Sequence, residues 1–150
     1  MRKQETARYS IELHTSIRAP IRDAWALLVD PVLLGQLYWD STVESDFISG
    51  HPIVWKGVWE GKPFQDKGIV RQVQAPTLLQ YTHWAPSSGP DTEENTSLLT
   101  WKLAEEKGEV RVTFLHENIA TQAMKDHSEP MWKMLLERMK EMLEKTKQPR

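Results

Sequence analysis

The sequence contains no cysteine. Disulfide bonds, thiolate metal sites and cysteine nucleophiles are therefore excluded, and the absence fits a reducing cytoplasm, which is the compartment we expect. No apolar run approaches the roughly 20 residues of a membrane-spanning helix. The first residues, MRKQETARYS, lack the apolar segment of a signal peptide, so we expect neither secretion nor a membrane span.

Neither sign of charge predominates. The chain has 19 basic and 21 acidic residues, with a formal net charge of -2, which provides no attractive field for nucleic acid or anionic membranes. Several catalytic motifs are also missing: the glycine-rich phosphate loop, the G-x-S-x-G elbow and the H-E-x-x-H zinc helix. We therefore expect no nucleic-acid partner, no cofactor, no metal and no catalytic residue that the sequence alone can assign.

Tryptophan, by contrast, is abundant. The 150 residues include 7 Trp, against 3 Phe and 3 Tyr. So many large rings with polar N–H groups indicate either a bulky core or an aromatic-lined cavity. The length is that of one domain, and we expect a single domain over residues 1–150 with a core from about residue 9 to 145.

Residue periodicity divides the chain into strands and helices. A strand is predicted at Tyr9–Ile17, followed by two short helices that begin after Pro20 and Asp30, with Asp30 as the cap of the second. Further strands are expected at 42–48, 53–60, 64–73, 79–83, 96–104 and 110–117, and a long amphipathic helix from about 124 to 147. Strands joined by short turns pair antiparallel. The pattern thus predicts an α+β fold in which a curved sheet of about six or seven strands packs against the long helix.

Several stretches resemble one family in the order in which they occur. They are IRAPIRDAWALLVDPVLLGQLY, GHPIVWKGVWEGKPFQDKGIVRQVQAPTLLQYTHW, SLLTWKL, EVRVTFLHENI and the closing helix with Trp132, Leu135, Leu136 and Met139. This ordered set is similar to the SRPBCC (START-like) superfamily, and more narrowly to homologues of the activator of heat shock protein 90 ATPase. The resemblance implies a helix-grip fold with a cavity between the sheet and the long helix. It also implies a choice among lipid and hormone binders, polyketide aromatases and cyclases, and co-chaperone domains.

The predicted inward face of the sheet is rich in aromatic residues. Strand parity and helical spacing place these candidate ligand contacts inside: Trp55, Trp59, Tyr81, His83, Trp101, Phe114, His116, Trp132, Leu136 and Met139. Apolar walls with a few polar groups are typical of small-molecule sites. The alternative is a filled core whose polar atoms are satisfied locally. We expect this space to bind an apolar small molecule.

Two histidines and one arginine leave the chemistry open. His83 and His116 could exchange protons inside the cavity or simply hydrogen-bond at its rim, and no third metal ligand follows at a suitable spacing. Arg71 faces inward if Ile69 and Val73 set the parity, but is solvated if Val70 sets it or a bulge switches it. The other histidines and the strand-region carboxylates are expected on the surface or in turns: His14, His51, His127, Asp40, Glu44, Asp46, Glu60 and Asp66.

Three functions therefore compete. The first, which we favour, is binding of an apolar small molecule. The second is an enzyme of the cyclase or hydrolase type, acting on a hydrophobic substrate through His83, His116, Tyr81 and Arg71. The third is a protein-interaction domain whose partner is a chaperone or a second copy of the chain, and it requires an exposed apolar patch.

Overall fold

The computed structural model describes residues 8–145 of the chain. The elements in chain order are β1 (Tyr9–Ile17), α1 (Ile21–Val29), α2 (Pro31–Leu37), β2 (Thr42–Glu44), β3 (Pro52–Trp59), β4 (Lys62–Gln74), β5 (Leu78–His83), β6 (Ser97–Glu106), β7 (Glu109–Ile119) and α3 (Gln122–Lys145). The strands form a seven-stranded antiparallel sheet in the order β1-β7-β6-β5-β4-β3-β2. The predicted α+β fold, with two short helices after the first strand and a long final helix, is confirmed.

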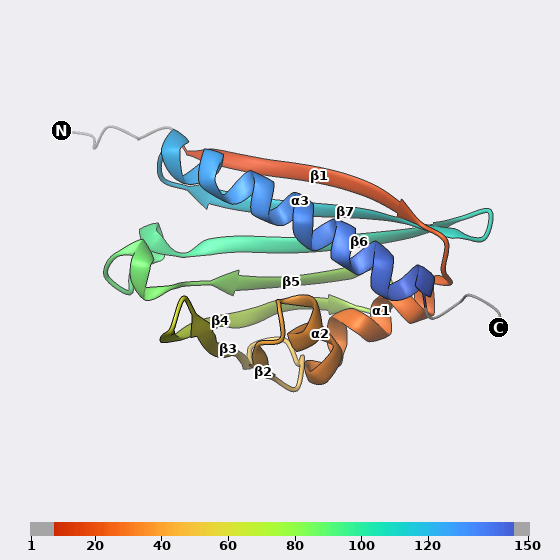
Figure 1. Ribbon diagram of the computed structural model, residues 1–150, viewed down its shortest axis with the longest axis horizontal. Helices are drawn as coiled ribbons and strands as arrows, with labels where there is room; N and C mark the ends of the chain where they lie inside the picture. Colours follow the sequence, from red (N-terminus) through yellow and green to blue (C-terminus); the bar gives the residue numbers. More distant parts are fainter. Residues whose placement is uncertain (1–7, 146–150) are drawn as a thin grey trace.

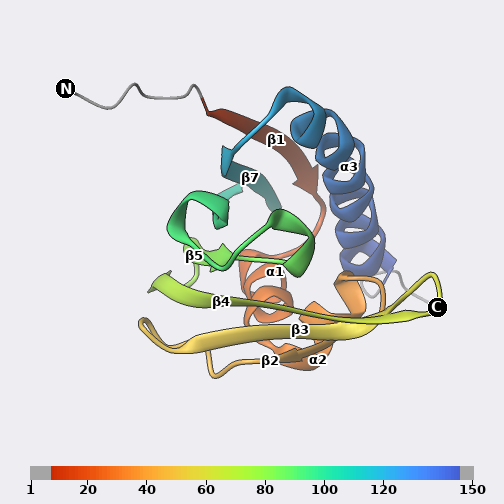
Figure 2. The same cartoon turned by 90° about the vertical axis from the view of Figure 1, so that its left-hand side faces the viewer.

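The helices lie on one face of the sheet. In Figure 1, α3 runs across the face formed by β1, β7 and β6. Figure 2 shows the sheet curving from β1 and β7 down to β4 and β3. The helix α3 packs mainly on β1 and β7, whereas α1 packs on β6 and β7 and α2 on β2. Together the three helices cover the concave face, which agrees with the expected helix-grip arrangement.

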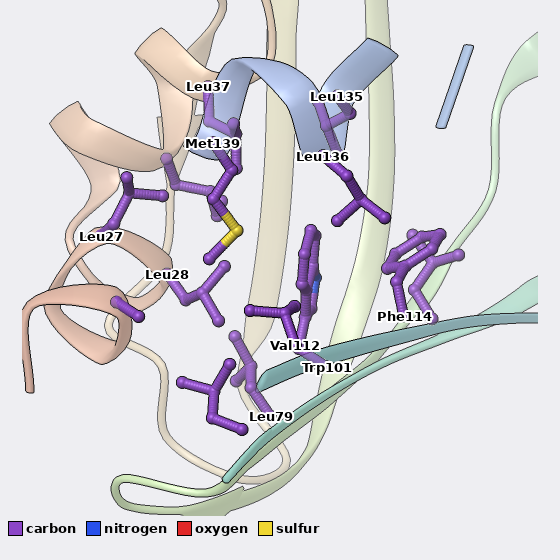
Figure 3. Close-up of a cluster of buried hydrophobic side chains, with 14 of the residues drawn as sticks. Leu27, Leu28, Leu37, Leu79, Trp101, Val112, Phe114, Leu135, Leu136 and Met139 are labelled. Atoms are coloured by element: carbon purple, nitrogen blue, oxygen red, sulfur yellow. The ribbon is translucent and has the colours of Figure 1, made fainter. Parts of the chain in front are cut away.

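The core lies between this face and the helices. In Figure 3, Leu136 and Met139 point from α3 toward Trp101, while Leu28 of α1 approaches from the side. All four side chains are at most 5% exposed. Burial of one such side chain contributes about 1.5–3 kcal/mol. The inward side chains of the strands, which recur every two residues, and those of the helices, which recur every 3.6 residues, pack together in one apolar layer.

The junction between α1 and α2 follows from two residues. Asp30 accepts hydrogen bonds at Oδ1 from the backbone N–H of Val32 at 2.8 Å and of Leu33 at 3.1 Å. Pro31 occupies the first helical position, where its missing N–H costs nothing. The predicted cap is confirmed, and a cap of this kind contributes about 1 kcal/mol.

The strand expected at 42–48 is shorter than predicted. β2 ends at Glu44, and the chain then turns so that Phe47, at φ 56°, reaches the core with 7% exposure. The hydroxyl of Ser45 accepts from the Phe47 N–H, and Asp46 accepts from the Ile48 N–H. Such side-chain acceptors replace the ladder bonds of an extended strand.

A bulge decides the orientation of Arg71. The β4–β5 register shifts between Val70 and Gln72. Val70 is fully buried, Ile69 is 39% exposed and Arg71 is exposed. Of the two alternatives for Arg71, the solvated one is therefore correct, and its guanidinium does not face the interior.

The long helix begins before it reaches the sheet. Its buried residues start at Trp132, and Pro130 lies inside the helix, where it cannot donate a backbone hydrogen bond. Met131 is 36% exposed and Met134 is 60% exposed, so neither belongs to the buried face of the helix. None of the helices within residues 8–145 has the length and apolarity needed to cross a bilayer.

Candidate ligand-binding site

Aromatic rings from the sheet, α3 and the end of α2 form one connected group, which we call the aromatic cluster: Tyr38, Trp55, Tyr81, Trp101, Phe114 and Trp132. The ring centroids of Trp101 and Phe114 are 4.7 Å apart, as are those of Phe114 and Trp132. Tyr38 bridges to the other side, at 6.2 Å from Trp132 and 6.0 Å from Trp55. These tilted and edge-on pairs have the favourable geometry of aromatic contacts.

Most of the sequence-predicted contacts do face this space. The following are buried: Trp55, Tyr81, Trp101, Phe114, His116, Trp132, Leu136 and Met139. His83 is partly buried, with 23% of its side chain exposed. The strand parity was thus sufficient to find the inward face, while the role of these residues as ligand contacts stays a prediction.

Trp59 does not belong to the site. Its inward placement was wrong, because it is 66% exposed at the end of the β3–β4 hairpin, where it pairs with Lys62. Val58, which has the opposite parity, is 68% exposed. Both faces of the hairpin end are exposed, which means that no helix covers this part of the sheet. The alternation of residues along a strand cannot show where the covering layer of helices ends.

Tyr81 is the centre of one buried hydrogen-bond group. Its hydroxyl oxygen accepts from Trp101 Nε1 at 2.9 Å and lies 3.1 Å from the Tyr38 hydroxyl. Burial raises the pKa of Tyr81 to about 12, and burial, reinforced by Tyr81, also raises the pKa of Tyr38. Both hydroxyls are therefore neutral near pH 7 and hold the rings in place.

His116 is the centre of a second group. Trp132 Nε1 donates to His116 Nδ1 at 2.8 Å, and His116 Nε2 lies 2.8 Å from the Ser97 hydroxyl. Because an indole N–H can only donate, Nδ1 must be the acceptor and Nε2 carries the proton. Burial, with a smaller contribution from His83, lowers the pKa of His116 to about 4. The ring is neutral near pH 7.

His83 has a carboxylate partner that the sequence analysis placed outside. Asp66 Oδ2 lies 3.0 Å from His83 Nε2, and the Asp66 side chain is only 19% exposed. The exterior placement of Asp66 was wrong, because it shares the inward parity of Val70 on β4. A carboxylate that orients a histidine is an arrangement found in general base catalysis.

The polar groups do not converge on one point. In the described part of the chain, no hydrogen bond joins Tyr81, His83 and His116 to one another. Arg71 lies outside, and no cluster of His, Asp and Glu side chains among residues 8–145 could hold a metal ion. The geometry thus supports an apolar binding site with a few separate hydrogen-bonding groups. It gives less support to an enzyme whose catalytic groups meet in one pocket.

Trp55 carries a buried polar atom that lacks a partner. Its side chain is 2% exposed, and its Nε1 has no hydrogen-bond acceptor within residues 8–145. The ring lies edge-on to His83 with centroids 4.9 Å apart, and 5.4 Å from the ring of Tyr81. An unsatisfied buried donor costs about 1–3 kcal/mol, so this N–H is a point at which a ligand could bind.

Sequence reasoning missed three polar residues of this site: Tyr38, Asp66 and Ser97. Asp66 could have been found, because Phe64, Gly68 and Val70 share its parity. Tyr38 and Ser97 lie at element ends, where periodicity carries no signal. They reach the site only because α2 and β6 are folded against the sheet.

Surface hollows among residues 8–145 lie away from the aromatic cluster. One is lined by residues of α2, Asp40 and the end of α3, including Gln36, Arg138 and Lys145. Another lies beside the 84–96 loop and is lined by Lys67, Ile69, Trp84 and their neighbours. Neither is lined by the aromatic cluster, whose rings pack directly on one another.

The model of one protein family covers most of the chain. Residues 18–144 match the family described as activator of Hsp90 ATPase homolog 1-like protein. The chain belongs to this family. The resemblance recognised in the sequence is thereby confirmed, and for this family member the fold and the buried aromatic cluster are established. None of the curated protein sequences is significantly similar to the chain.

Several solved structures share this fold. The solution structure of ChR145 from Cytophaga hutchinsonii has 36% sequence identity and a TM-score of 0.81, covering 95% of this chain and 98% of the other. The Aha1 dimer from Colwellia psychrerythraea has 20% identity and a TM-score of 0.73, covering 93% and 99%. PFC0360w, an HSP90 activator from Plasmodium falciparum, has 15% identity and a TM-score of 0.73, covering 89% and 95%. At these lower identities, the last two show a shared fold.

Proposed function

We propose that this protein binds a small apolar, aromatic molecule between the concave face of the sheet and α3. The observation that carries the proposal is the aromatic cluster, which combines broad apolar surface with a few fixed polar atoms. That composition is typical of small-molecule sites. The ten contacts named from the sequence, without Trp59 and with Tyr38 added, are the residues we assign to this site.

Ligand entry requires the two layers to separate locally. The rings pack at centroid distances of 4.7–6.2 Å, so a ligand must displace side chains that α3 contributes. Leu136 and Met139 are the residues to move, since both point from α3 into the layer (Figure 3). Methionine adapts to varied shapes, and the exposed first turns of α3 before Trp132 leave that end of the helix less constrained.

The test is titration with two probes of the same shape, 2-acetylnaphthalene and 2-isopropenylnaphthalene, followed by NMR of the indole N–H groups. We expect saturable binding of at least one probe at one site, with shifts at Trp101 and Trp132. Leu136→Phe adds bulk inside the layer and should weaken binding about tenfold. Met134→Phe, on the exposed side of the same helix, is the control and should bind as the parent does. Absence of binding by both probes and by a wider aromatic panel would refute the proposal.

A second proposal is that the chain associates with a second copy of itself. Val58 and Trp59 expose apolar side chains on the two opposite faces of the β3–β4 hairpin end, and exposed apolar surface marks interaction sites. The relative from Colwellia psychrerythraea was solved as a dimer. We infer that this hairpin end mediates self-association, which is separate from the ligand site on the concave face.

A further inference from the structure

The three buried indoles differ in how their N–H groups are satisfied. Trp101 Nε1 donates to the Tyr81 hydroxyl at 2.9 Å, and Trp132 Nε1 donates to His116 at 2.8 Å. Trp55 Nε1 is equally enclosed but has no acceptor among residues 8–145. Buried indole N–H groups normally find a partner. The unsatisfied N–H of Trp55 therefore requires an explanation, whereas the N–H groups of Trp101 and Trp132 do not.

Among residues 8–145, no acceptor near Trp55 lies within hydrogen-bond distance of its N–H. The Tyr81 hydroxyl already accepts from Trp101 and lies against Tyr38. His83 presents its ring edge-on at 4.9 Å and uses Nε2 for Asp66. Yet His83 and Asp66 keep 23% and 19% of their side chains exposed, so the Trp55 end of the cluster is next to solvent. The Trp55 ring, which contacts the His83 ring, is therefore separated from solvent on this side by partly exposed side chains.

We propose that the Trp55 indole N–H binds a neutral oxygen acceptor, such as a ketone carbonyl, on the aromatic ligand of this site. The inference rests on the proposed function and specifies its ligand class. One N–H donor matches one carbonyl oxygen, and the bond would remove the unsatisfied donor when the ligand binds. The flat ring system of the ligand would then lie against the apolar part of the cluster, between Trp101 and the side chains of α3.

The charge of the site favours a neutral acceptor over a carboxylate. The Asp66 side chain, hydrogen-bonded to His83, already places a carboxyl group at this end of the cluster. Arg71, the cation considered for such a role, is exposed on the outside. A carboxylate ligand would therefore be buried beside another carboxyl group and without the Arg71 guanidinium to pair with, which is costly.

The test compares three naphthalenes that differ at one group: 2-acetylnaphthalene, 2-isopropenylnaphthalene and 2-naphthoate. The first two have nearly the same shape, but only the ketone carries an acceptor oxygen. We expect the ketone to bind about tenfold more tightly than the alkene, and the carboxylate to bind more weakly than the ketone. Trp55→Phe keeps an aromatic ring but removes the N–H, and should reduce the preference for ketone over alkene to about one.

A spectroscopic readout on the unaltered protein keeps the test decisive if the Trp55→Phe variant does not fold. The Trp55 indole N–H resonance should move downfield on binding of the ketone and not on binding of the alkene. Equal affinities for ketone and alkene, with the Trp55 resonance unmoved, would overturn the inference and leave the binding proposal standing. If neither compound binds and no member of the wider aromatic panel binds, the proposed function itself fails. Tighter binding of the naphthoate would also overturn the choice of a neutral acceptor.

Discussion

His116 occupies a position that only a neutral imidazole can fill. One ring nitrogen accepts from Trp132 and the other donates to Ser97. A protonated ring would turn the acceptor into a donor facing another donor. Burial therefore acts together with hydrogen bonding to favour the neutral form, and lowers the pKa to about 4.

This arrangement predicts that stability falls in mild acid. Between pH 6.5 and about 4 the unfolded chain protonates His116 while the folded protein does not, so the unfolded state binds more protons and the free energy of unfolding decreases as the pH falls. From pH 7 to pH 5 the loss due to this residue should be about 2 kcal/mol. Urea unfolding at the two pH values measures it.

Two variants isolate the contribution of His116. His116→Gln removes the titration and should lose less stability between pH 7 and pH 5 than the parent protein does. His127→Gln changes an exposed histidine of α3 and should keep the parental pH dependence. An equal loss in all three proteins would show that other groups cause the acid sensitivity.

Within the β4–β5 pair, a single glycine sets how closely two strand segments approach. A Cβ on Gly68 would lie 1.7 Å from the backbone oxygen of Thr82. The preceding residue, Lys67, exchanges backbone hydrogen bonds with Trp84 at 2.9 and 2.7 Å. Glycine at this point permits the close contact that holds Asp66 and His83 on the same inward face.

The long helix depends on one of its faces. Leu135 is fully buried and the preceding Met134 is 60% exposed, although both are apolar and both favour helices. We predict that Leu135→Ala lowers the free energy of unfolding by about 2–5 kcal/mol, because it removes buried surface and leaves a cavity. Met134→Ala should change it by less than about 0.5 kcal/mol. Denaturant unfolding of the two variants measures both. Similar losses would mean that α3 does not lie on the sheet as described.

Element types followed from the sequence to different extents. The alternation in Tyr9–Ile17 and the three- and four-residue spacing after Trp132 each predicted their element, because a single buried face controls them. The segment after Glu44 did not behave as predicted, since Ser45 and Asp46 provide local acceptors that compete with strand pairing. Pro130, in contrast, lies within α3 as the periodicity predicted, although local propensity alone would have ended the helix there.

At the scale of the whole molecule, one end of the sheet projects beyond the covered face. Val58 and Trp59 there are 68% and 66% exposed, and the three-residue edge strand β2 pairs with β3 only at residues 54–56. Large apolar side chains on an open hairpin lower their free energy by burial against another surface. This is the physical basis for proposing that two copies associate through it.

Self-association can be measured by sedimentation velocity over a range of protein concentrations. We predict that the average mass rises with concentration and that Trp59→Ser shifts the equilibrium toward the monomer. Val32→Ser alters a residue of α2 that is also 68% exposed, and it should leave the equilibrium unchanged. A parent protein that stays monomeric throughout, or an equal effect of both substitutions, would contradict the proposal.

Periodicity in the amino-acid sequence was sufficient to predict most elements and the inward parity of most strands, and the ordered motifs were sufficient to recognise the family. These depend on neighbours along the chain, where side-chain direction repeats with a fixed period. Only the tertiary structure decided that Trp59 lies beyond the covered layer, that a bulge turns Arg71 outward and that Asp66 meets His83. It also decided that Trp55 alone among the buried indoles of residues 8–145 lacks an acceptor. Each of these side-chain environments depends on which residue from a distant part of the sequence becomes its neighbour. Packing between the layers and strand register determine those neighbours.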